Sequence, residues 1–257
     1  MSASKHKKLT DMLLPEIGDK TMSTTTVKRY LRVFKEFLTY AQRKGYVSAA
    51  LNVQIEIPVK DSRQSYDRFT KAELLKIFNP EYYPYPEDEN FAYRYYIPLM
   101  ALYSGARLNE LCQLYCDDIK KENNIYYMIF TDERPDQHLK NKVSKRIVPI
   151  HPKIIEMGFL DYLLSVKSKR KQRVFYQLTY AQYNHYADKM SKWFGRYLES
   201  IGISGKRKVF HSFRHTVKPE LRDANVGREY QNAICGWEGI DTGERVYGSN
   251  FPIEILY

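Results

Sequence analysis

Cysteine is scarce in this 257-residue chain, and long hydrophobic runs are missing. Cys112, Cys116 and Cys235 form an odd set, which argues against a disulfide framework and favours a reducing compartment. Cys112 and Cys116 are four residues apart, which predicts buried thiols on one helix face, with no second pair to complete a zinc site. No apolar run approaches the roughly 20 residues that span a bilayer, and the N-terminal segment lacks the apolar core of a secretory signal. We therefore expect a soluble, cytoplasmic protein.

Acidic residues are outnumbered by basic ones. The chain has 41 lysines and arginines against 30 aspartates and glutamates, a formal charge of +11 and a pI of about 9.3. Such a surface attracts polyanions, so nucleic acid is the first partner to consider. The excess can also serve solubility alone, and charge does not decide between the two. The length allows one large domain or two modest ones, each with a real core.

Residues 23–45 carry the period of one amphipathic helix. Its apolar stripe consists of Val27, Tyr30, Leu31, Phe34, Leu38 and Ala41. Basic side chains, among them Lys28, Arg29 and Arg32, lie elsewhere around the helix. They form either a solvated face of a bundle helix or contacts to DNA phosphates, and both interpretations stay open.

Residues 52–68 contain Pro58, lack a helical period and are interpreted as a linker. A new domain begins where Thr70 and Glu73 predict a capping box. Further helices are expected over residues 91–105, 106–114, 152–166 and 178–203, and in the segment that carries residues 211–216. The β-rich runs 125–131 and 146–150 predict a small antiparallel sheet. The fold class is therefore mainly α with a small antiparallel β-sheet (α+β).

Residues 211–216 read HSFRHT and allow three interpretations: a metal site, an ordinary helix face or an anion clamp. His211 and His215, at i and i+4, can face one metal ion, but no carboxylate lies between them and Arg214 adds a positive charge. We predict no metal and no cofactor. His211 and Arg214 share a helix face, which suits a phosphate.

Arg107 lies in SGARLNEL, just after Gly105 and close to the start of a helix, where backbone N–H groups favour an anion. Glu110, three residues on, can hold its guanidinium in place. An arginine and a glutamate at this spacing are also compatible with a surface ion pair worth under about 1 kcal/mol.

The order SGARLNELCQL, HSFRHT, ICGW and RVYG resembles the motifs of the tyrosine recombinase family, also called phage integrases. The resemblance covers nearly all of residues 68–250 and is nearest to phage and genomic-island integrases. It implies a partial helical core-site DNA-binding domain over residues 1–60 and a catalytic domain over residues 61–257. It also implies double-stranded DNA as partner and strand cleavage and rejoining through a 3′-phosphotyrosyl intermediate.

The resemblance assigns a role to each matching position. Arg107 and Arg214 hold the scissile phosphate, and His211 hydrogen-bonds it and helps to manage the proton of the nucleophile, Tyr247. Trp237 stands where most members have histidine, and its indole N–H can donate but cannot shuttle a proton. Lys140 is the best match to the general acid, with Lys142 as the competing choice. His215 is expected to be a supporting hydrogen-bonder.

This set of residues is chemically reasonable without the family. A phenol with a pKa of about 10 is about 0.1% ionised at neutral pH, so forming the phenolate costs roughly 4 kcal/mol without nearby cations. Two arginines and a histidine around a phosphate supply such stabilisation. The attack conserves the phosphodiester's free energy in the covalent link, so neither ATP nor metal is needed.

Other basic runs are less specific. Lys206, Arg207 and Lys208 lead into the active-site helix and are expected to touch DNA, whereas KSKRKQR at 167–173 is either solvated or phosphate-binding. Pro219 falls about two turns into that helix, at a cost of about 3 kcal/mol unless the helix kinks or begins late.

Three functions compete. The leading one is an integrase, acting as a tetramer on DNA or as a monomer if the chain, which stops ten residues after Tyr247, is a shortened form. A type IB topoisomerase uses the same cluster to relax supercoils. A DNA-binding protein with a vestigial cluster is the third.

Overall fold

The computed structural model describes residues 24–48, 66–85, 87–203, 205, 207–237 and 251–257. The chain divides into two compact units, Met1–Arg63 and Gln64–Tyr257. In the first unit, α2 (Thr24–Arg43) confirms the predicted amphipathic helix, and Ala41 is its most deeply buried apolar residue. Most of the predicted linker, and the position of Tyr247, lie outside the described residues.

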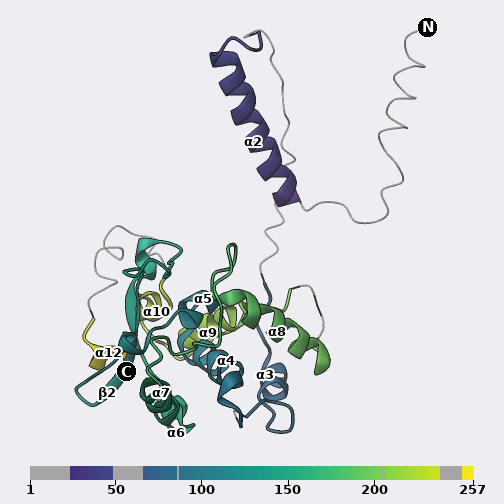
Figure 1. Cartoon of the computed structure of the whole chain (residues 1–257). Helices are drawn as coiled ribbons and strands as arrows, with labels where there is room; N and C mark the ends of the chain where they lie inside the picture. Colours follow the sequence, from purple (N-terminus) through teal and green to yellow (C-terminus); the bar gives the residue numbers. More distant parts are fainter. Residues whose placement is uncertain (1–23, 49–65, 86, 204, 206, 238–250) are drawn as a thin grey trace. The chain divides into compact units, whose positions relative to one another are not determined.

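The second unit is built mainly of helices, with one small sheet at its side (Figure 1), which confirms the predicted fold class. Its α-helices are α3 (Lys71–Ile77), α4 (Ala92–Ser104), α5 (Leu108–Cys112), α6 (Pro152–Glu156), α7 (Phe159–Ser168), α8 (Ala187–Ser200), α9 (Ser212–Asp223), α10 (Arg228–Cys235) and α12 (Ile253–Leu256). Its strands and 3-10 turns are η1 (Glu89–Phe91), η2 (Cys116–Asp118), β1 (Ile119–Glu122), β2 (Ile125–Phe130), η3 (Lys142–Ser144) and β3 (Arg146–Pro149).

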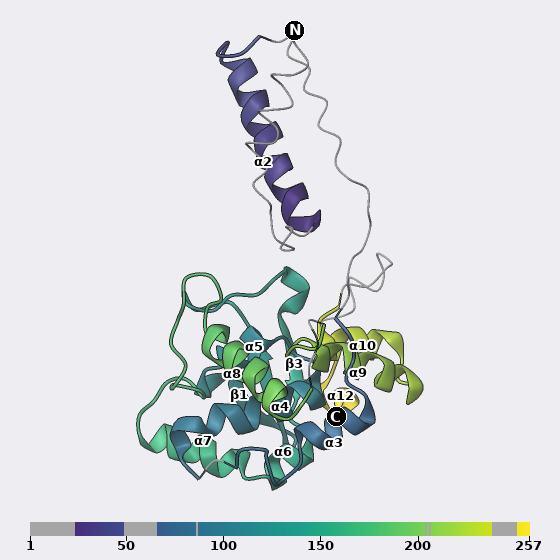
Figure 2. The ribbon, with the colours of Figure 1, turned by 90° about the vertical axis from the view of Figure 1, so that its right-hand side faces the viewer.

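Helix α4 forms the centre of this unit. It packs against α5, α6, α8 and α9, and Ile97, Met100 and Ala101 are completely buried within it. Figure 2 shows α9, α10 and α12 together on one side of the unit and α7 on the other. Helix α9 contacts both α4 and α10, and α10 contacts β3. These contacts bring together four elements, α4, α9, α10 and β3, that are separate in the sequence.

The helix starts and stops follow local chemistry. Thr70 caps α3, with its hydroxyl accepting from the backbone N–H of Glu73 at 3.2 Å and the Glu73 carboxylate accepting from the Thr70 N–H at 2.8 Å, so the predicted capping box is confirmed. Helix α4 ends as predicted at Gly105, which adopts a left-handed conformation with φ 62°.

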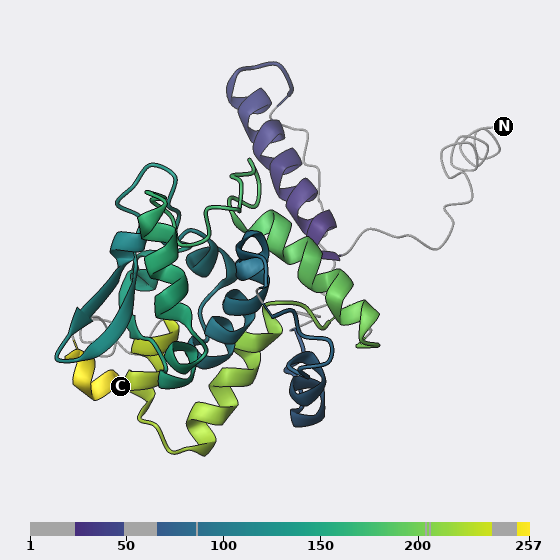
Figure 3. The same ribbon diagram turned by 60° about the horizontal axis from the view of Figure 1, so that its bottom comes forward.

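The sheet is antiparallel in the order β1-β2-β3. Strands β2 and β3 confirm the two predicted strands, whereas β1 was missed. Its sequence IKKE places exposed charges at three of four positions on an edge strand, so it carries no hydrophobic alternation. Helix α12 packs against β2 and β3 beside the sheet (Figure 3).

Two predicted helices are shorter than expected. The segment 152–166 is split into α6 and α7 at Gly158, whose φ is 82°. The segment 178–203 becomes helical only at Ala187, because Ala181 and His185 form a β-bridge in a turn that precedes α8. Apolar spacing alone does not reveal such breaks.

The prediction that Cys112 and Cys116 share a helix face was wrong, since α5 ends at Cys112 and Cys116 begins η2. The prediction of buried thiols was right for these two, and Cys235 is buried as well. None of the helices in the described part of the chain combines the length and the hydropathy needed to cross a bilayer.

Candidate active site

Arg107 owes its position to the tight turn between α4 and α5. A Cβ atom on Gly105 would lie 2.9 Å from the sulfur of Cys235, so the left-handed glycine also permits close packing against α10. Arg107 is the N-cap of α5, and its backbone N–H donates to Glu110 Oε2 at 2.9 Å. The predicted location at a helix start is confirmed.

Glu110 binds two arginines, and this is no surface ion pair. Its Oε1 accepts from Arg107 Nη1 at 2.7 Å and its Oε2 from Arg146 Nη2 at 2.9 Å, while the residue is only 2% exposed. Burial alone would raise the pKa of Glu110, but Arg146 and Arg107 hold it below its ordinary value. The carboxylate is therefore ionised and fixes the Arg107 guanidinium, as predicted.

Arg146, the first residue of β3, is a structural member of the site that the sequence reasoning missed. Its Nε donates to the carbonyl of Ile234 at 2.8 Å and its Nη1 to the carbonyl of Ser144 at 2.8 Å. The guanidinium also lies over the Phe130 ring. The sequence carried a signal for this burial, because residues 146, 148 and 150 of a strand point to the same face and two of them are the apolar Val148 and Ile150. All three are buried.

Helix α9 runs from Ser212 to Asp223 with Pro219 inside it, so the proline neither ends the helix nor delays its start. His211 is the N-cap, and Arg214 lies in the first turn with 5% exposure. Arg214 Nη1 donates to the carbonyls of Gly105, at 2.8 Å, and Cys235, and its Nη2 donates to that of Gly236 at 3.2 Å.

One cavity of about 270 Å³ collects the predicted catalytic residues that the structure describes. It is lined by Arg107, Lys140, His211, Arg214, His215, Lys218 and Trp237. Lys140 reaches it from the connection between β2 and β3, whereas the competing Lys142 begins η3 and does not line it. Arg107 is far in sequence from residues 211–218. The contacts of α9 with α4 and α10 bring them together.

The two arginines on the cavity floor keep part of their hydrogen-bonding capacity. A guanidinium has five N–H donors. In the described structure Arg107 uses three of them, on Glu110 Oε1, Ser144 Oγ and the Gly236 carbonyl. Arg214 likewise uses three, on the carbonyls of Gly105, Cys235 and Gly236. Two donors remain on each, so both arginines can donate further hydrogen bonds to an anion in the cavity that they line.

The cavity is electrostatically prepared for an anion. Burial, followed by the charges of His215, Arg214, Arg107 and Lys140, lowers the pKa of His211 to about 4, so this imidazole is neutral at pH 7. Burial and the charge of Arg107 also lower the pKa of Arg214 to about 10, so the guanidinium remains charged. Both shifts reflect burial first and the neighbouring positive charges second, and an anion bound in the cavity would reduce the repulsion between these charges.

Trp237 forms one wall of the cavity. The guanidinium carbon of Arg214 lies 5.0 Å from the centre of its ring, and the Lys218 ammonium lies 4.8 Å from it. His215 packs edge-on to His211 with the ring centres 5.1 Å apart, which fits the predicted supporting role. Lys218 was not singled out from the sequence, although it follows His211 and Arg214 at i+7 and i+4 on one helix face.

The predicted DNA-binding residues fare differently. Arg207 pairs with Asp67 at 3.0 Å and Lys208 pairs with Glu73, so carboxylates already compensate both charges. Lys206 lies outside the described residues. Lys28, Arg29 and Arg32 lie on α2, in the other unit.

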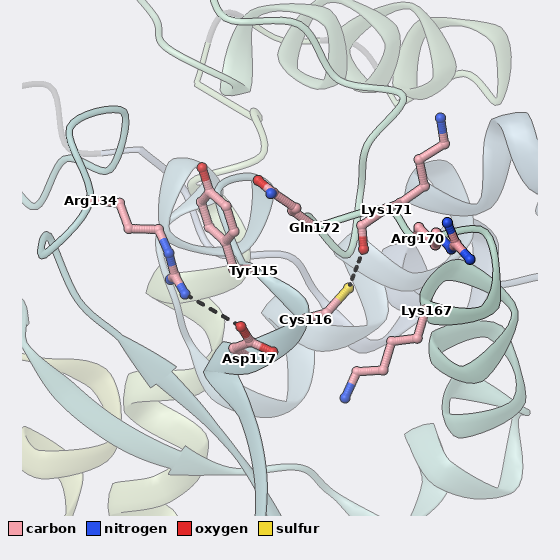
Figure 4. Close-up of a pocket in the computed structure, with 8 residues that line it drawn as sticks. All are labelled: Tyr115, Cys116, Asp117, Arg134, Lys167, Arg170, Lys171 and Gln172. Carbon is pink, nitrogen blue, oxygen red and sulfur yellow. Dashed lines mark hydrogen bonds and ion pairs between the residues drawn. The ribbon is translucent and has the colours of Figure 1, made fainter.

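A second basic concavity lies at the end of α7, where Lys167, Arg170 and Lys171 face Tyr115 and Arg134 across a cleft of about 410 Å³ (Figure 4). Arg134 is held by the Tyr115 ring and by Asp118. Cations at the C-terminal end of a helix are favoured by its dipole, which accounts for the lysines without a ligand. The predicted choice between solvation and phosphate binding at 167–173 therefore stays open.

Comparisons with known proteins agree with this geometry. The profile of the phage integrase family matches residues 68–251. Among proteins of curated function, none is significantly similar in sequence. XerH site-specific recombinase bound to palindromic difH substrate, in a post-cleavage complex, has a similar fold, with a TM-score of 0.63 and 16% identity over 94% of this chain and 67% of that one. The Tn1549 transposon integrase in complex with circular intermediate DNA gives a TM-score of 0.60 and 18% identity over 98% of this chain and 82% of that one.

The family match spans well over half of the chain, and the fold of the second unit is that of a tyrosine recombinase catalytic domain. The chain belongs to the phage integrase family.

Proposed function

We propose that this protein is a site-specific DNA recombinase of the integrase type, which cleaves and rejoins strands through a 3′-phosphotyrosyl intermediate. The observation that carries the proposal is that two guanidiniums, that of half-buried Arg107 and that of buried Arg214, line one cavity, and each uses only three of its five N–H donors within the described structure. A phosphodiester is the anion of double-stranded DNA, and the similar Tn1549 transposon integrase was solved in complex with circular intermediate DNA.

In this mechanism the arginines bind the non-bridging oxygens of the scissile phosphate. These interactions become stronger as negative charge builds on the oxygens in the transition state. Tyr247 attacks the phosphorus, the bond to the 5′ oxygen breaks, and Lys140 gives that oxygen its proton. Tyr247 loses its phenolic proton as it attacks, and His211, whose pKa is lowered to about 4 and which is therefore neutral, takes that proton at one ring nitrogen while the other ring N–H donates to the phosphate. Attack by another 5′-hydroxyl on the phosphotyrosine rejoins the strand and releases Tyr247.

Trp237 contributes a hydrogen bond and a wall, without proton transfer. Glu110 and Arg146 do not line the cavity and act by holding Arg107. His215 supports His211 through ring contact.

The two alternatives receive less support. Neither the family match nor the structures named above point to a type IB topoisomerase. A vestigial cluster is disfavoured because Pro219 leaves α9 continuous and His211 and Arg214 line the same cavity. We further infer that the protein acts as a tetramer on DNA and in the cytoplasm.

A covalent-capture experiment tests the proposal. Nicked duplexes with a randomised sequence around the nick release a short strand after attack and so trap the adduct, and denaturing gels separate it. The wild-type protein should yield adducts enriched in one sequence, and Tyr247→Phe should yield none. Adducts that persist in Tyr247→Phe would contradict the assignment of the nucleophile.

A further inference from the structure

Lys218 is a cation of the cavity to which neither the motifs nor the mechanism assigns a role. It lies on α9 one turn after Arg214 and lines the same cavity. Unlike Arg214, it is exposed, so it stands at the mouth of the cavity and not on its floor. The question is what an ammonium at this place can bind.

Its charge is not compensated by the described part of the protein. No carboxylate there lies within 4.0 Å of the Lys218 ammonium, whereas Lys208 and Arg207 are paired with Glu73 and Asp67. Lys218 contributes instead to lowering the pKa of the neighbouring His215, after burial and Arg214. An uncompensated cation beside other cations is favourable only where an anion arrives.

The position of the ammonium is set by an aromatic face. It lies 4.8 Å from the centre of the Trp237 ring, a cation–π distance that leaves its N–H groups available to solvent or ligand. Trp237 therefore holds Lys218 at one side of the mouth, and Lys140 lines the same cavity from the connection between β2 and β3.

The floor is sufficient for a single phosphate. The four N–H donors that Arg107 and Arg214 retain match the two non-bridging oxygens of the scissile group, so an ammonium farther out meets the next group along the strand. Resting on the proposed function, we infer that Lys218 binds the backbone phosphate adjacent to the scissile one and thereby fixes the register of the strand in the cavity.

Salt-dependent DNA binding tests this contact. In a Tyr247→Phe background, which prevents trapping, Lys218→Gln should weaken binding of duplex DNA about tenfold near 0.1 M salt and reduce the slope of log K against log salt by about 0.9. Lys218→Arg should retain the slope. Lys120→Gln, an exposed lysine on β1, is the matched control and should change neither quantity.

A methylphosphonate scan then locates the contact. Replacing the phosphate that Lys218 binds by a neutral methylphosphonate should weaken DNA binding by the parent protein and leave DNA binding by Lys218→Gln unchanged. We expect this pattern at a position adjacent to the scissile phosphate. The inference would be overturned if the losses in binding caused by the methylphosphonate and by Lys218→Gln were fully additive at both adjacent positions. It would also be overturned if Lys218→Gln bound DNA with the same affinity and the same salt slope as the parent protein. Because Lys218 is exposed, unfolding curves should show that both variants fold normally. Adduct formation by the wild-type protein together with an unchanged slope contradicts Lys218 alone, whereas absent adducts contradict the proposed function.

Discussion

Arg107 and Arg214 donate to the same acceptor, the carbonyl oxygen of Gly236, at 3.4 and 3.2 Å. One peptide unit after α10 therefore fixes the relative position of two guanidiniums that come from α5 and α9. Since Gly236 also packs against Arg146, the buried pair Glu110–Arg146 and the cavity floor form one connected polar network. Such a network restricts both arginines before any phosphate is bound, which lowers the reorganisation needed at the reacting centre.

Gly236→Ala should disable the site. Gly236 has φ 63°, and a Cβ atom there would lie 2.8 Å from Arg146 Nη1. Left-handed strain and overpacking together should lower the free energy of unfolding by roughly 2–4 kcal/mol. A displaced Gly236 carbonyl should reduce adduct formation about a hundredfold.

Gly195→Ala is the matched control for that experiment. Gly195 lies in α8, and a Cβ atom there meets nothing within 4 Å. This substitution should raise the free energy of unfolding by roughly 0.5–1 kcal/mol and leave cleavage intact. Equal effects of the two substitutions in urea unfolding would show that Gly236 has no special role.

Glu110→Gln should destabilise the fold as well as the site. It removes the carboxylate shared by Arg107 and Arg146 and leaves buried positive charge without compensation, a change that costs about 3–5 kcal/mol in proteins. Glu133→Gln removes the exposed partner of Lys145 and should leave the urea midpoint unchanged. A Glu110→Gln midpoint equal to that of the wild type would mean that the triad is not needed for stability.

Lys140→Ala should slow cleavage by about 10²–10⁴-fold, because the 5′ oxygen is a poor leaving group without a proton. A 5′-phosphorothiolate leaving group scarcely needs protonation, so cleavage of that substrate should be nearly normal. Lys142→Ala, outside the cavity, serves as the control and should cleave both substrates like the wild type. Rescue of Lys142→Ala instead of Lys140→Ala would reverse the assignment.

Stability should decline in mild acid through His211. Burial and nearby cations lower the pKa of this imidazole from 6.5 to about 4, so between these values the unfolded chain binds the proton and the folded one does not. The contribution of His211 is therefore complete above pH 6.5 and is lost as the pH falls toward 4. Urea unfolding at pH 7 and pH 5 should show a smaller loss for His211→Gln than for the wild type. Parallel losses would contradict a depressed pKa.

Much of this structure could be predicted where local chemistry decides it. The capping box at Thr70, the end of α4 at Gly105 and the pairing of Arg107 with Glu110 each depend on residues close in sequence. The strands β2 and β3 were predictable because their β-rich composition reflects partial burial.

The remainder depends on tertiary contacts. Strand β1 exists because Ile119–Glu122 pairs with β2, although its charged sequence gives no strand signal. Arg146 lies on β3, where the sequence pattern predicts apolar side chains at the buried positions. Its buried guanidinium is explained only by its ion pair with Glu110. The resemblance to tyrosine recombinases likewise left two candidate lysines, and the fold brings Lys140 into the cavity and leaves Lys142 out.

Peptide mapping of the covalent adduct is the most direct measurement of the central claim. The chain has 23 tyrosines, and the account predicts that adducts captured from the nicked library carry the nucleotide on Tyr247 alone and disappear in Arg214→Ala, whose side chain lies on the cavity floor. A nucleotide linked to any other tyrosine, or adducts that form equally well without Arg214, would contradict the claim that this cavity binds the scissile phosphate.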